Sequence, residues 1–160
     1  RAVTSANLKS GALIDVTPTY ITYTGGSVAT TSTSFADLHA SAAFNGVAPG
    51  FYIGEFFILY NAAATTTGAR FALNGTITQD YLSYLIGYST QSGDRSSAQT
   101  SNFDGGAAAP SSLATTGNNA VLQFSIHVTG AGDIAFRFAS EVGGSAITVT
   151  SLIGFIRRVS

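Results

Sequence analysis

Acid–base or nucleophilic chemistry in this chain would depend on two histidines, His39 and His127. Asp37 stands two residues before His39 and serines are abundant, so a hydrolytic Ser-His-Asp triad is the first chemistry to weigh. A triad is defined by its geometry, and a local Asp-x-His spacing does not build one. His127 falls on the polar side of an alternating pattern, where a surface imidazole needs no catalytic explanation. We therefore expect no catalytic residue and no enzymatic activity.

The sequence also gives little support for a catalytic pair of carboxylates, a calcium site or a phosphate-binding loop. The acidic residues are scattered, and no two share a spacing that would hold a general acid and a general base on one strand. Asp94 and Asp104 lie in Gly-rich segments, but no D-x-D-x-D-G run supplies the converging oxygens that calcium needs. Glycines at 130–132 and 143–144 precede strand patterns, whereas a phosphate cradle leads into a helix. We expect no metal site and no bound cofactor.

Two segments have large apolar side chains at both alternating positions of a strand. In residues 51–60 Glu55 is the lone charge, and residues 81–88 combine tyrosines with leucine and isoleucine. A strand of this kind is covered on both faces, so in a small sandwich its second cover is a loop layer or another subunit. We expect a contact between copies of the chain that uses Phe51, Ile53, Phe57, Leu59, Tyr81, Tyr84 and Tyr88.

The tyrosines also permit a different interpretation, because a flat aromatic ring can stack on the face of a sugar. Tyr88, with the low-complexity segments 90–100 and 104–119, would then form a carbohydrate- or receptor-binding surface. The contact between copies is favoured because the residues around these tyrosines are apolar throughout.

Sequence patterns typical of β-strands cover most of the chain, so we expect strands to position the contact residues and tyrosines named above. Alternation is clearest at residues 121–128, and turn residues at 129–133 lead into a second alternating run at 134–138, which together predict a hairpin. A helical turn is expected only within residues 34–43, with Ser34 as N-cap. Residues 90–100 and 104–119 are expected to be surface loops. Further strands are expected at residues 14–24, 28–35, 70–78, 81–88, 99–103, 147–149 and 152–159.

These strands predict an all-β fold, an antiparallel β-sandwich in a single domain over residues 13–160. Residues 1–12 lack a clear period and are expected to form an extended N-terminal arm. The chain of 160 residues has room for one core, and its 11 Phe and 7 Tyr supply the bulk while Ala, Gly, Ser and Thr make up about half of the sequence.

Composition excludes several classes of partner and site. Charged residues are 9% of the chain and the net charge is −1, which argues against an electrostatic nucleic-acid binder. The absence of cysteine removes disulfides, thiolate zinc sites and cysteine nucleophiles. No apolar run reaches the roughly 18 residues of a membrane helix, so we expect a soluble chain without membrane insertion. Because Arg1 begins a chain without methionine, we expect a longer gene product.

Several motifs stand in a recognisable order. Pro49-Gly50-Phe51-Tyr52 opens the apolar block, Thr-Thr-Gly-Ala-Arg-Phe occupies residues 66–71, and residues 132–139 read Gly-Asp-Ile-Ala-Phe-Arg-Phe-Ala. Arg157-Arg158-Val159 closes the chain. Over residues 47–160 this order resembles the jelly-roll-like modules of tailed-bacteriophage virion proteins. The chain departs from that pattern at Ile153-Gly154, where the family has a Gly-Ser pair, and no residue roles are carried over.

The resemblance implies a jelly-roll-like sandwich and a non-enzymatic, homotrimeric structural protein on the surface of the virion. It would decorate or cement the phage head, or belong to a fibre, and the alternative is the receptor- or carbohydrate-binding tip of a tail fibre. The implied partners are further copies of the chain, other virion proteins such as the major capsid protein and, for a fibre tip, a host-surface glycan. Neither nucleic acid nor a membrane is among the implied partners.

Overall fold

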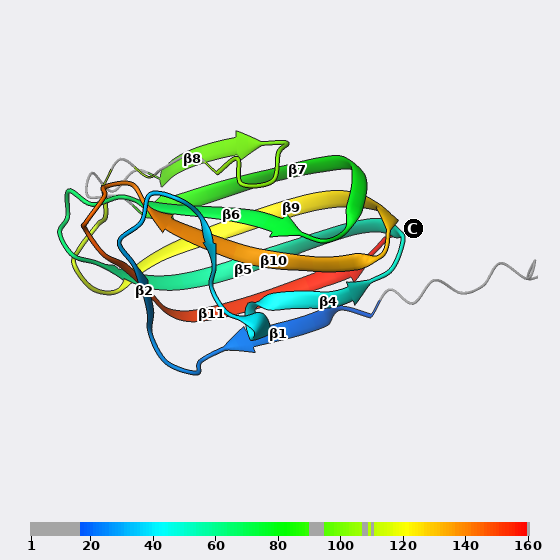
Figure 1. The fold of residues 1–160 in the computed structure, drawn as a ribbon, viewed down its shortest axis with the longest axis horizontal. Coiled ribbons are helices and arrows are strands. Elements are labelled where there is room, and N and C mark those ends of the chain that lie inside the picture. The colour runs from blue at the N-terminus through cyan, green and yellow to red at the C-terminus, as the bar shows by residue number, and fades with distance from the viewer. Residues whose placement is uncertain (1–16, 90–94, 107–108, 110, 160) are drawn as a thin grey trace, which may run out of the picture.

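Two antiparallel β-sheets pack face to face in the computed structural model, which describes residues 17–89, 95–106, 109 and 111–159 (Figure 1). The elements in chain order are β1 (Thr19–Tyr23), β2 (Val28–Thr30), β3 (Ala36–Asp37), the 3-10 helix η2 (Ala40–Ala42), β4 (Ala43–Val47), β5 (Gly50–Ala62), β6 (Ala69–Gly75), β7 (Thr78–Ser89), β8 (Arg95–Thr100), β9 (Asn118–Gly130), β10 (Gly132–Ser140) and β11 (Ile147–Arg158). The predicted all-β, jelly-roll-like antiparallel sandwich is confirmed. The expected arm, residues 1–12, lies outside the described residues.

The larger sheet has seven strands in the order β1-β11-β5-β9-β7-β8, and β2 pairs with the other end of β11. Its long central strands fix which side chains are neighbours. Phe57 in β5 stands opposite Val121 of β9 on one side and Ile153 of β11 on the other. The middle of this sheet therefore places apolar side chains from three separate parts of the sequence in one row.

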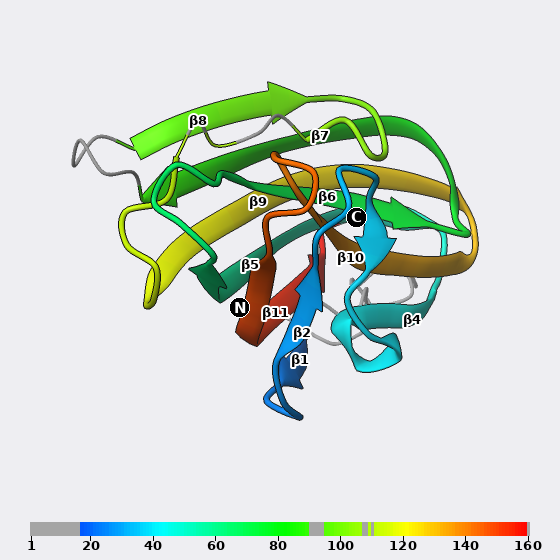
Figure 2. The same ribbon diagram turned by 60° about the vertical axis from the view of Figure 1, so that its left-hand side comes forward.

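The smaller sheet has four strands arranged around β10. On one side β10 pairs with β6, and on the other it pairs with β3 and β4 one after the other. Figure 2, turned by 60°, separates β4 and β10 of this sheet from β5, β9 and β11 of the larger one. The strand expected at 70–78 is found as β6 but ends at Gly75, and the run at 134–138 is part of β10.

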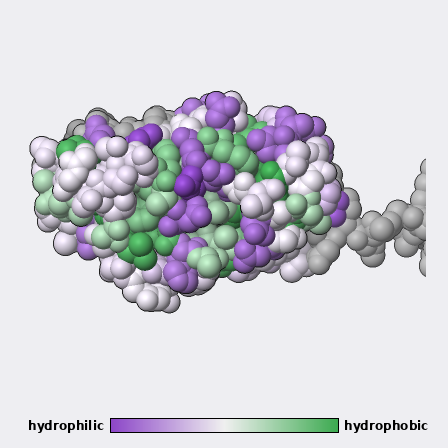
Figure 3. All heavy atoms as spheres, viewed as in Figure 1, coloured by the Kyte–Doolittle hydropathy of each residue, from purple (hydrophilic) through white to green (hydrophobic). Residues whose placement is uncertain are grey.

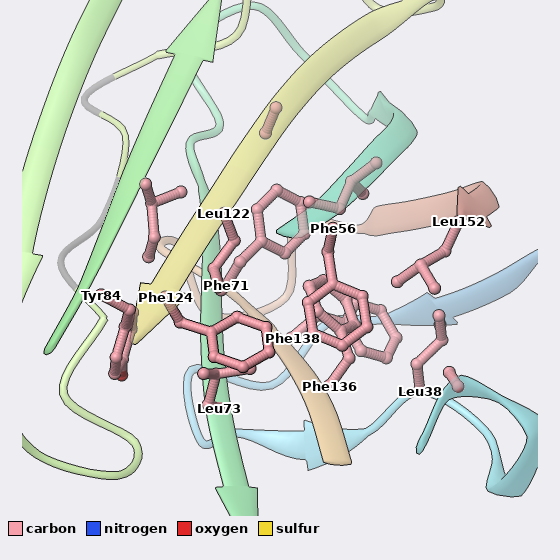
Figure 4. Packing of buried hydrophobic residues seen from close by; sticks show 14 of the residues in the cluster. Leu38, Phe56, Phe71, Leu73, Tyr84, Leu122, Phe124, Phe136, Phe138 and Leu152 are labelled. Atoms are coloured by element: carbon pink, nitrogen blue, oxygen red, sulfur yellow. The ribbon is translucent and has the colours of Figure 1, made fainter. Parts of the chain in front are cut away.

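Aromatic rings fill the space between the sheets. Phe56 of the larger sheet lies against Phe136 of the smaller one with ring centroids 5.3 Å apart, and Phe71 lies 5.5 Å from Phe136 (Figure 4). Each of these rings is fully buried. Burial of an aromatic side chain contributes roughly 2 to 3 kcal/mol, so this cluster is a major source of the stability of the sandwich.

Two glycines on the core side of the larger sheet make room for these rings. A Cβ on Gly54 would lie 2.2 Å from Cζ of Phe124, and a Cβ on Gly154 would lie 2.7 Å from Cδ1 of Phe56. Each ring lies across the backbone of the neighbouring strand, in the space that a side chain would otherwise occupy. Gly154 is therefore a glycine that the packing requires.

The predicted hairpin at residues 121–138 is wrong. β9 pairs with β5 and β7, whereas β10 pairs with strands of the other sheet, so the turn at residues 130–132 carries the chain from one layer to the other. A Cβ on Gly132 would lie 2.6 Å from the backbone nitrogen of Ile77, which shows how tight this passage is. The sequence of β9 and that of β10 both alternate between apolar and polar residues. A sandwich buries the apolar side of each strand whether the two strands pair in one sheet or lie in opposite sheets, so alternation does not distinguish the two arrangements.

Other local expectations need smaller corrections. The strand expected at 28–35 ends at Thr30, and that at 14–24 is limited within the described residues to Thr19–Tyr23. The segment 90–100, expected to be a loop, contains β8. The N-cap of the short helix is His39 and not Ser34, because the His39 ring accepts a hydrogen bond from the backbone N–H of Ser41.

Candidate functional site

The face of the seven-stranded sheet that points away from the core, here called the outer face, is rich in exposed apolar side chains. In β5 the even-numbered residues from Tyr52 to Tyr60 point into the core, and their odd-numbered neighbours point outward. β7, β9 and β11 alternate in the same way. The large apolar side chains exposed on this face are Tyr20, Phe51, Ile53, Phe57, Leu59, Tyr81, Leu85 and Ile153.

The centre of the outer face holds a shallow apolar hollow of about 420 Å³. Phe57, Leu59, Val121 and Ile153 contribute its apolar side chains, and Asn119 and Ser151 contribute polar side chains. Phe57 and Ile153 are each 49% exposed although they stand opposite one another in adjacent strands. Apolar surface in such a hollow is stabilised when a matching side chain removes it from water.

Charge is sparse on the outer face. Glu55 lies between Phe155 and Gln123, and its Oε2 accepts a hydrogen bond of 2.8 Å from Nε2 of Gln123. At the end of the face, Nδ1 of His127 lies 2.6 Å from Oδ1 of Asp80. Glu55 and His127 are thus held by neighbours within the sheet, whereas Arg157, opposite Ile53, adds an exposed positive charge. The centre around Phe57 is apolar.

Five of the seven residues expected at a contact between copies lie on the outer face: Phe51, Ile53, Phe57, Leu59 and Tyr81. The expectation for Tyr84 and Tyr88 is not met, because both side chains are buried inside the sandwich. They share the inward parity of Leu82 and Ile86. Tyr88 is therefore no sugar platform either, which removes the aromatic residue on which the sequence-based carbohydrate surface depended.

The buried tyrosines have a structural role. The Tyr88 hydroxyl accepts a hydrogen bond from the backbone N–H of Phe71, and the Tyr84 hydroxyl donates to the carbonyl of Asn102. Burial raises the pKa of Tyr84 to about 12 and raises that of Tyr88 further, because the phenolate would lose its hydration. Both side chains anchor backbone segments beneath the larger sheet.

Three further residues of the outer face were not expected there from the sequence, namely Tyr20, Leu85 and Ile153. Alternation within residues 81–88 could have separated Leu85 from the buried tyrosines, since it has the same parity as Tyr81. The position of Ile153 beside Phe57 follows from the pairing of β11 with β5, and nothing in the local sequence reveals that pairing.

A second feature lies on the opposite side of the molecule, over the four-stranded sheet. It is a cleft of about 510 Å³ lined mostly by polar residues, here called the polar cleft. Both Asp37 and His39 line it. Figure 3 views the molecule from this side and shows hydrophilic residues gathered over the middle of the face.

The polar cleft does not assemble the hydrolytic triad weighed above. Nδ1 of His39 lies 2.8 Å from Oγ of Ser41, but the same nitrogen also accepts the backbone N–H of Ser41, so this contact is a helix cap. Asp37 lies 2.9 Å from Nε of Arg137 and forms no ion pair with His39 among the described residues. A triad needs an acid that orients the imidazole, and that member is missing here.

Arg137 forms the most connected polar centre in the described part of the chain. Its Nη1 donates to Oδ2 of Asp104 and its Nη2 donates to the carbonyl of Phe35 at 2.7 Å. The N–H at Nε points away from the line to Asp37, so that contact is an ion pair without a hydrogen bond. Arg137 thus joins β10 to two loops and uses its charge within the chain.

Two arrangements are absent from the residues that the structure describes. There, no three His, Asp or Glu side chains come together in a way that could hold a metal ion. Among the same residues, no helix has both the length and the apolar character needed to cross a bilayer.

Comparison with known proteins gives only distant similarity. No protein-family model matches the chain, and no curated protein matches it. Among solved structures, the Eiger TNF from S. frugiperda shares 12% sequence identity over 89% of this chain and 92% of its own, with a TM-score of 0.46. TmCBM61, solved in complex with beta-1,4-galactotriose, shares 9% identity over 76% of this chain and 86% of its own, with a TM-score of 0.25. The infectious bursal disease virus VP2 subviral particle shares 11% identity over 89% of this chain and 41% of its own, with a TM-score of 0.26.

Proposed function

We propose that this protein is a non-enzymatic structural protein of a tailed-bacteriophage virion, which forms a homotrimer through the outer face of its seven-stranded sheet. It sits on the particle surface, where it decorates or cements the head or belongs to a fibre. The main observation that supports this proposal is the cluster of exposed apolar side chains around Phe57.

The size of the outer face supports stable association. With strands about 4.8 Å apart and a rise of about 3.3 Å per residue, four strands of nine residues cover roughly 600 Å² before side-chain relief is counted. A standard interface buries about 800 Å² on each partner. The outer face therefore approaches the extent of a specific protein contact, and its area lies at the upper end of the roughly 300 to 600 Å² covered by the largest apolar patch on a typical monomer.

The chemistry of the face favours further copies of the same chain as its occupant. A partner recognised by charge would need a complementary charged patch, whereas Glu55 here is hydrogen-bonded to Gln123 and the centre around Phe57 is apolar. An apolar hollow and projecting side chains such as Phe51 occur on the same surface, so the side chains of one copy can fill the hollow of another. A closed ring of copies then removes the whole patch from water.

The virion assignment rests on the family resemblance of residues 47–160 together with this capacity for assembly. In that setting the major capsid protein or another virion protein is the second partner. The proposed role needs no catalytic residue, cofactor, nucleic acid or inserted membrane segment. The alternative is a receptor-binding fibre tip. Its contacts with the receptor would then lie on a surface that does not include Tyr88.

Cysteine labelling tests the assembly directly because the natural chain has no thiol. Ser125→Cys places one thiol on the outer face between β5 and β7, and Thr76→Cys places a control thiol at the polar cleft on the opposite side. We expect a maleimide to react at least about tenfold more slowly with position 125 than with position 76 at concentrations where copies associate. Equal rates that do not change with protein concentration would contradict assembly through this face.

Particle location is tested separately with antibodies against the folded chain. Immunogold labelling of intact particles from the source phage should mark the head or a fibre. Absence of the chain from purified particles would contradict the virion role while leaving self-association to be judged by the labelling rates.

A further inference from the structure

The polar cleft has a floor without bulky side chains. Ala135 in β10 stands between Ala43 of β4 and Asn74 of β6, and Gly75 follows Asn74 at the edge. A ligand can therefore approach the sheet closely, with its C–H groups against the alanine methyls. The volume of about 510 Å³ falls within the range of small-molecule sites, roughly 300 to 1,000 Å³.

The walls of the polar cleft present a mixture of hydrogen-bonding groups from several parts of the chain. The amide of Asn45, the imidazole of His39, the hydroxyl of Thr76 and the carboxylate of Asp133 all line the space. Oδ1 of Asp133 accepts the backbone N–H of Gly46 at 2.8 Å, which holds this carboxylate in place. Thr76 is held as well, because its Oγ1 accepts the backbone N–H of Asp133 at 2.9 Å.

Charge narrows the class of ligand. Arg137 is the cation of the polar cleft, and it is already paired with Asp37 and Asp104. Asp133 adds a further carboxylate on the wall without a cationic partner among the described residues. Phosphate, sulfate and acidic sugars would meet net negative charge, so these ligands are disfavoured.

A hydroxyl both donates and accepts hydrogen bonds, which suits walls that alternate carboxylate, amide, imidazole and hydroxyl groups. We propose that the polar cleft is a binding site for a neutral saccharide, with the sugar ring over Ala43 and Ala135 and its hydroxyls on Asn45, Asp133 and His39. Two fixed groups, Asp133 and Thr76, define the orientation because each is already held by a backbone bond.

This site lies on the sheet opposite the outer face, so an assembly through the outer face leaves it open to the surroundings. The proposal does not depend on the oligomeric state or on a virion location. It differs from the sequence-based sugar surface, which used Tyr88 and the segments 90–100 and 104–119.

The test is a titration followed by two-dimensional NMR of the full chain. The probes are the methyl glycosides of glucose, galactose, mannose and N-acetylglucosamine, with N-acetylneuraminic acid and putrescine as charged comparators. We expect at least one neutral glycoside to cause saturable shifts at Ala43, Asn45 and Ala135, and neither charged probe to do so.

Two variants and one control locate the binding. Ala135→Leu fills the floor and should abolish the shifts, and Asn45→Ala should weaken binding about tenfold through the loss of hydrogen bonds. Ala29→Leu makes the same change at an exposed strand position in the other sheet and should leave binding unchanged. If Ala135→Leu disturbs the fold, Asn45→Ala still decides the outcome.

Three results would overturn the proposal: no shifts in the polar cleft with any neutral glycoside up to its solubility, shifts at another surface only, or binding of putrescine in place of the glycosides. Retained binding in Asn45→Ala and Ala135→Leu would also place the sugar elsewhere. None of these outcomes affects the mass of the assembly, so the two proposals fail separately.

Discussion

The rings of Phe51 and His127 lie stacked on the outer face, with centroids 3.9 Å apart and planes 9° apart. His127 is itself held by Asp80 at 2.6 Å, so an exposed phenylalanine is fixed in position by two neighbouring strands. A side chain that is ordered before association loses less conformational entropy when a partner covers it. In the proposed assembly, this end of the outer face is therefore ordered before a second copy binds.

Phe57→Asp tests the centre of the outer face. The new carboxylate would be buried against the apolar hollow of a neighbouring copy, and burial of an unpaired charge costs several kcal/mol. We expect the variant to be monomeric at concentrations where the natural chain associates, as measured by analytical ultracentrifugation.

Leu113→Asp is the matched control for Phe57→Asp. Leu113 is comparably exposed, at 44% against 49%, but lies in the loop before β9. This variant should associate like the natural chain. A Phe57→Asp protein that remains fully associated, or an equal loss of association in both variants, would contradict the assignment of the outer face.

Gly54→Ala tests the aromatic packing between the sheets. Its Cβ would lie 2.2 Å from Phe124, whose ring has to move within a filled core, and overpacking of this kind costs about 1 to 3 kcal/mol. Gly87→Ala is the control, because a Cβ there meets nothing within 4 Å. We expect the urea midpoint to fall for Gly54→Ala and to stay or rise slightly for Gly87→Ala. Equal midpoints would refute the steric role of Gly54.

Arg137→Met tests the ion-pair centre beside the polar cleft. The substitution leaves Asp104 without its cationic partner in a partly buried site, so we expect a loss of about 2 kcal/mol in the free energy of unfolding. Asp37→Asn removes the more exposed partner, whose side chain is 67% exposed, and should cost less than about 1 kcal/mol. Urea unfolding at neutral pH measures both, and a larger loss for Asp37→Asn would contradict this ranking.

Residue alternation accounts for much of what could be predicted from the sequence. It located β9 and β10, while runs with apolar residues at both alternating positions located β5 and β7. It did not reveal strand pairing, because β9 and β10 have the same alternating pattern whether they pair or lie in opposite layers. The row of Ile153, Phe57 and Val121 depends on that pairing and appears only in the folded chain.

The error at Tyr84 and Tyr88 has a different origin. Every position of residues 81–88 looked suitable for an interface by composition, yet a strand has two faces and only one of them is exposed. The inward face is the one that carries Leu82 and Ile86, and the hydroxyls of both tyrosines find buried backbone partners. Parity within the strand thus outweighs the general enrichment of tyrosine at interfaces.

Alkaline unfolding should report the buried tyrosines. The pKa of Tyr84 is raised to about 12 in the folded chain, whereas an unfolded tyrosine titrates near 10. Between these values the unfolded chain loses protons that the folded chain retains, so stability is intact below about pH 10 and falls as pH rises toward 12. Urea midpoints at successive pH values measure the loss, and Tyr84→Phe should reduce it. A pH-independent midpoint from 9 to 12 would contradict the cost assigned to burial.

In the proposed assembly, the outer face joins three copies of this chain. Multi-angle light scattering of the natural chain over a wide range of concentrations tests it most directly, since the mass of one chain is 16.3 kDa. We expect a limiting mass three times that of one chain. A mass of a single chain at every concentration would contradict it.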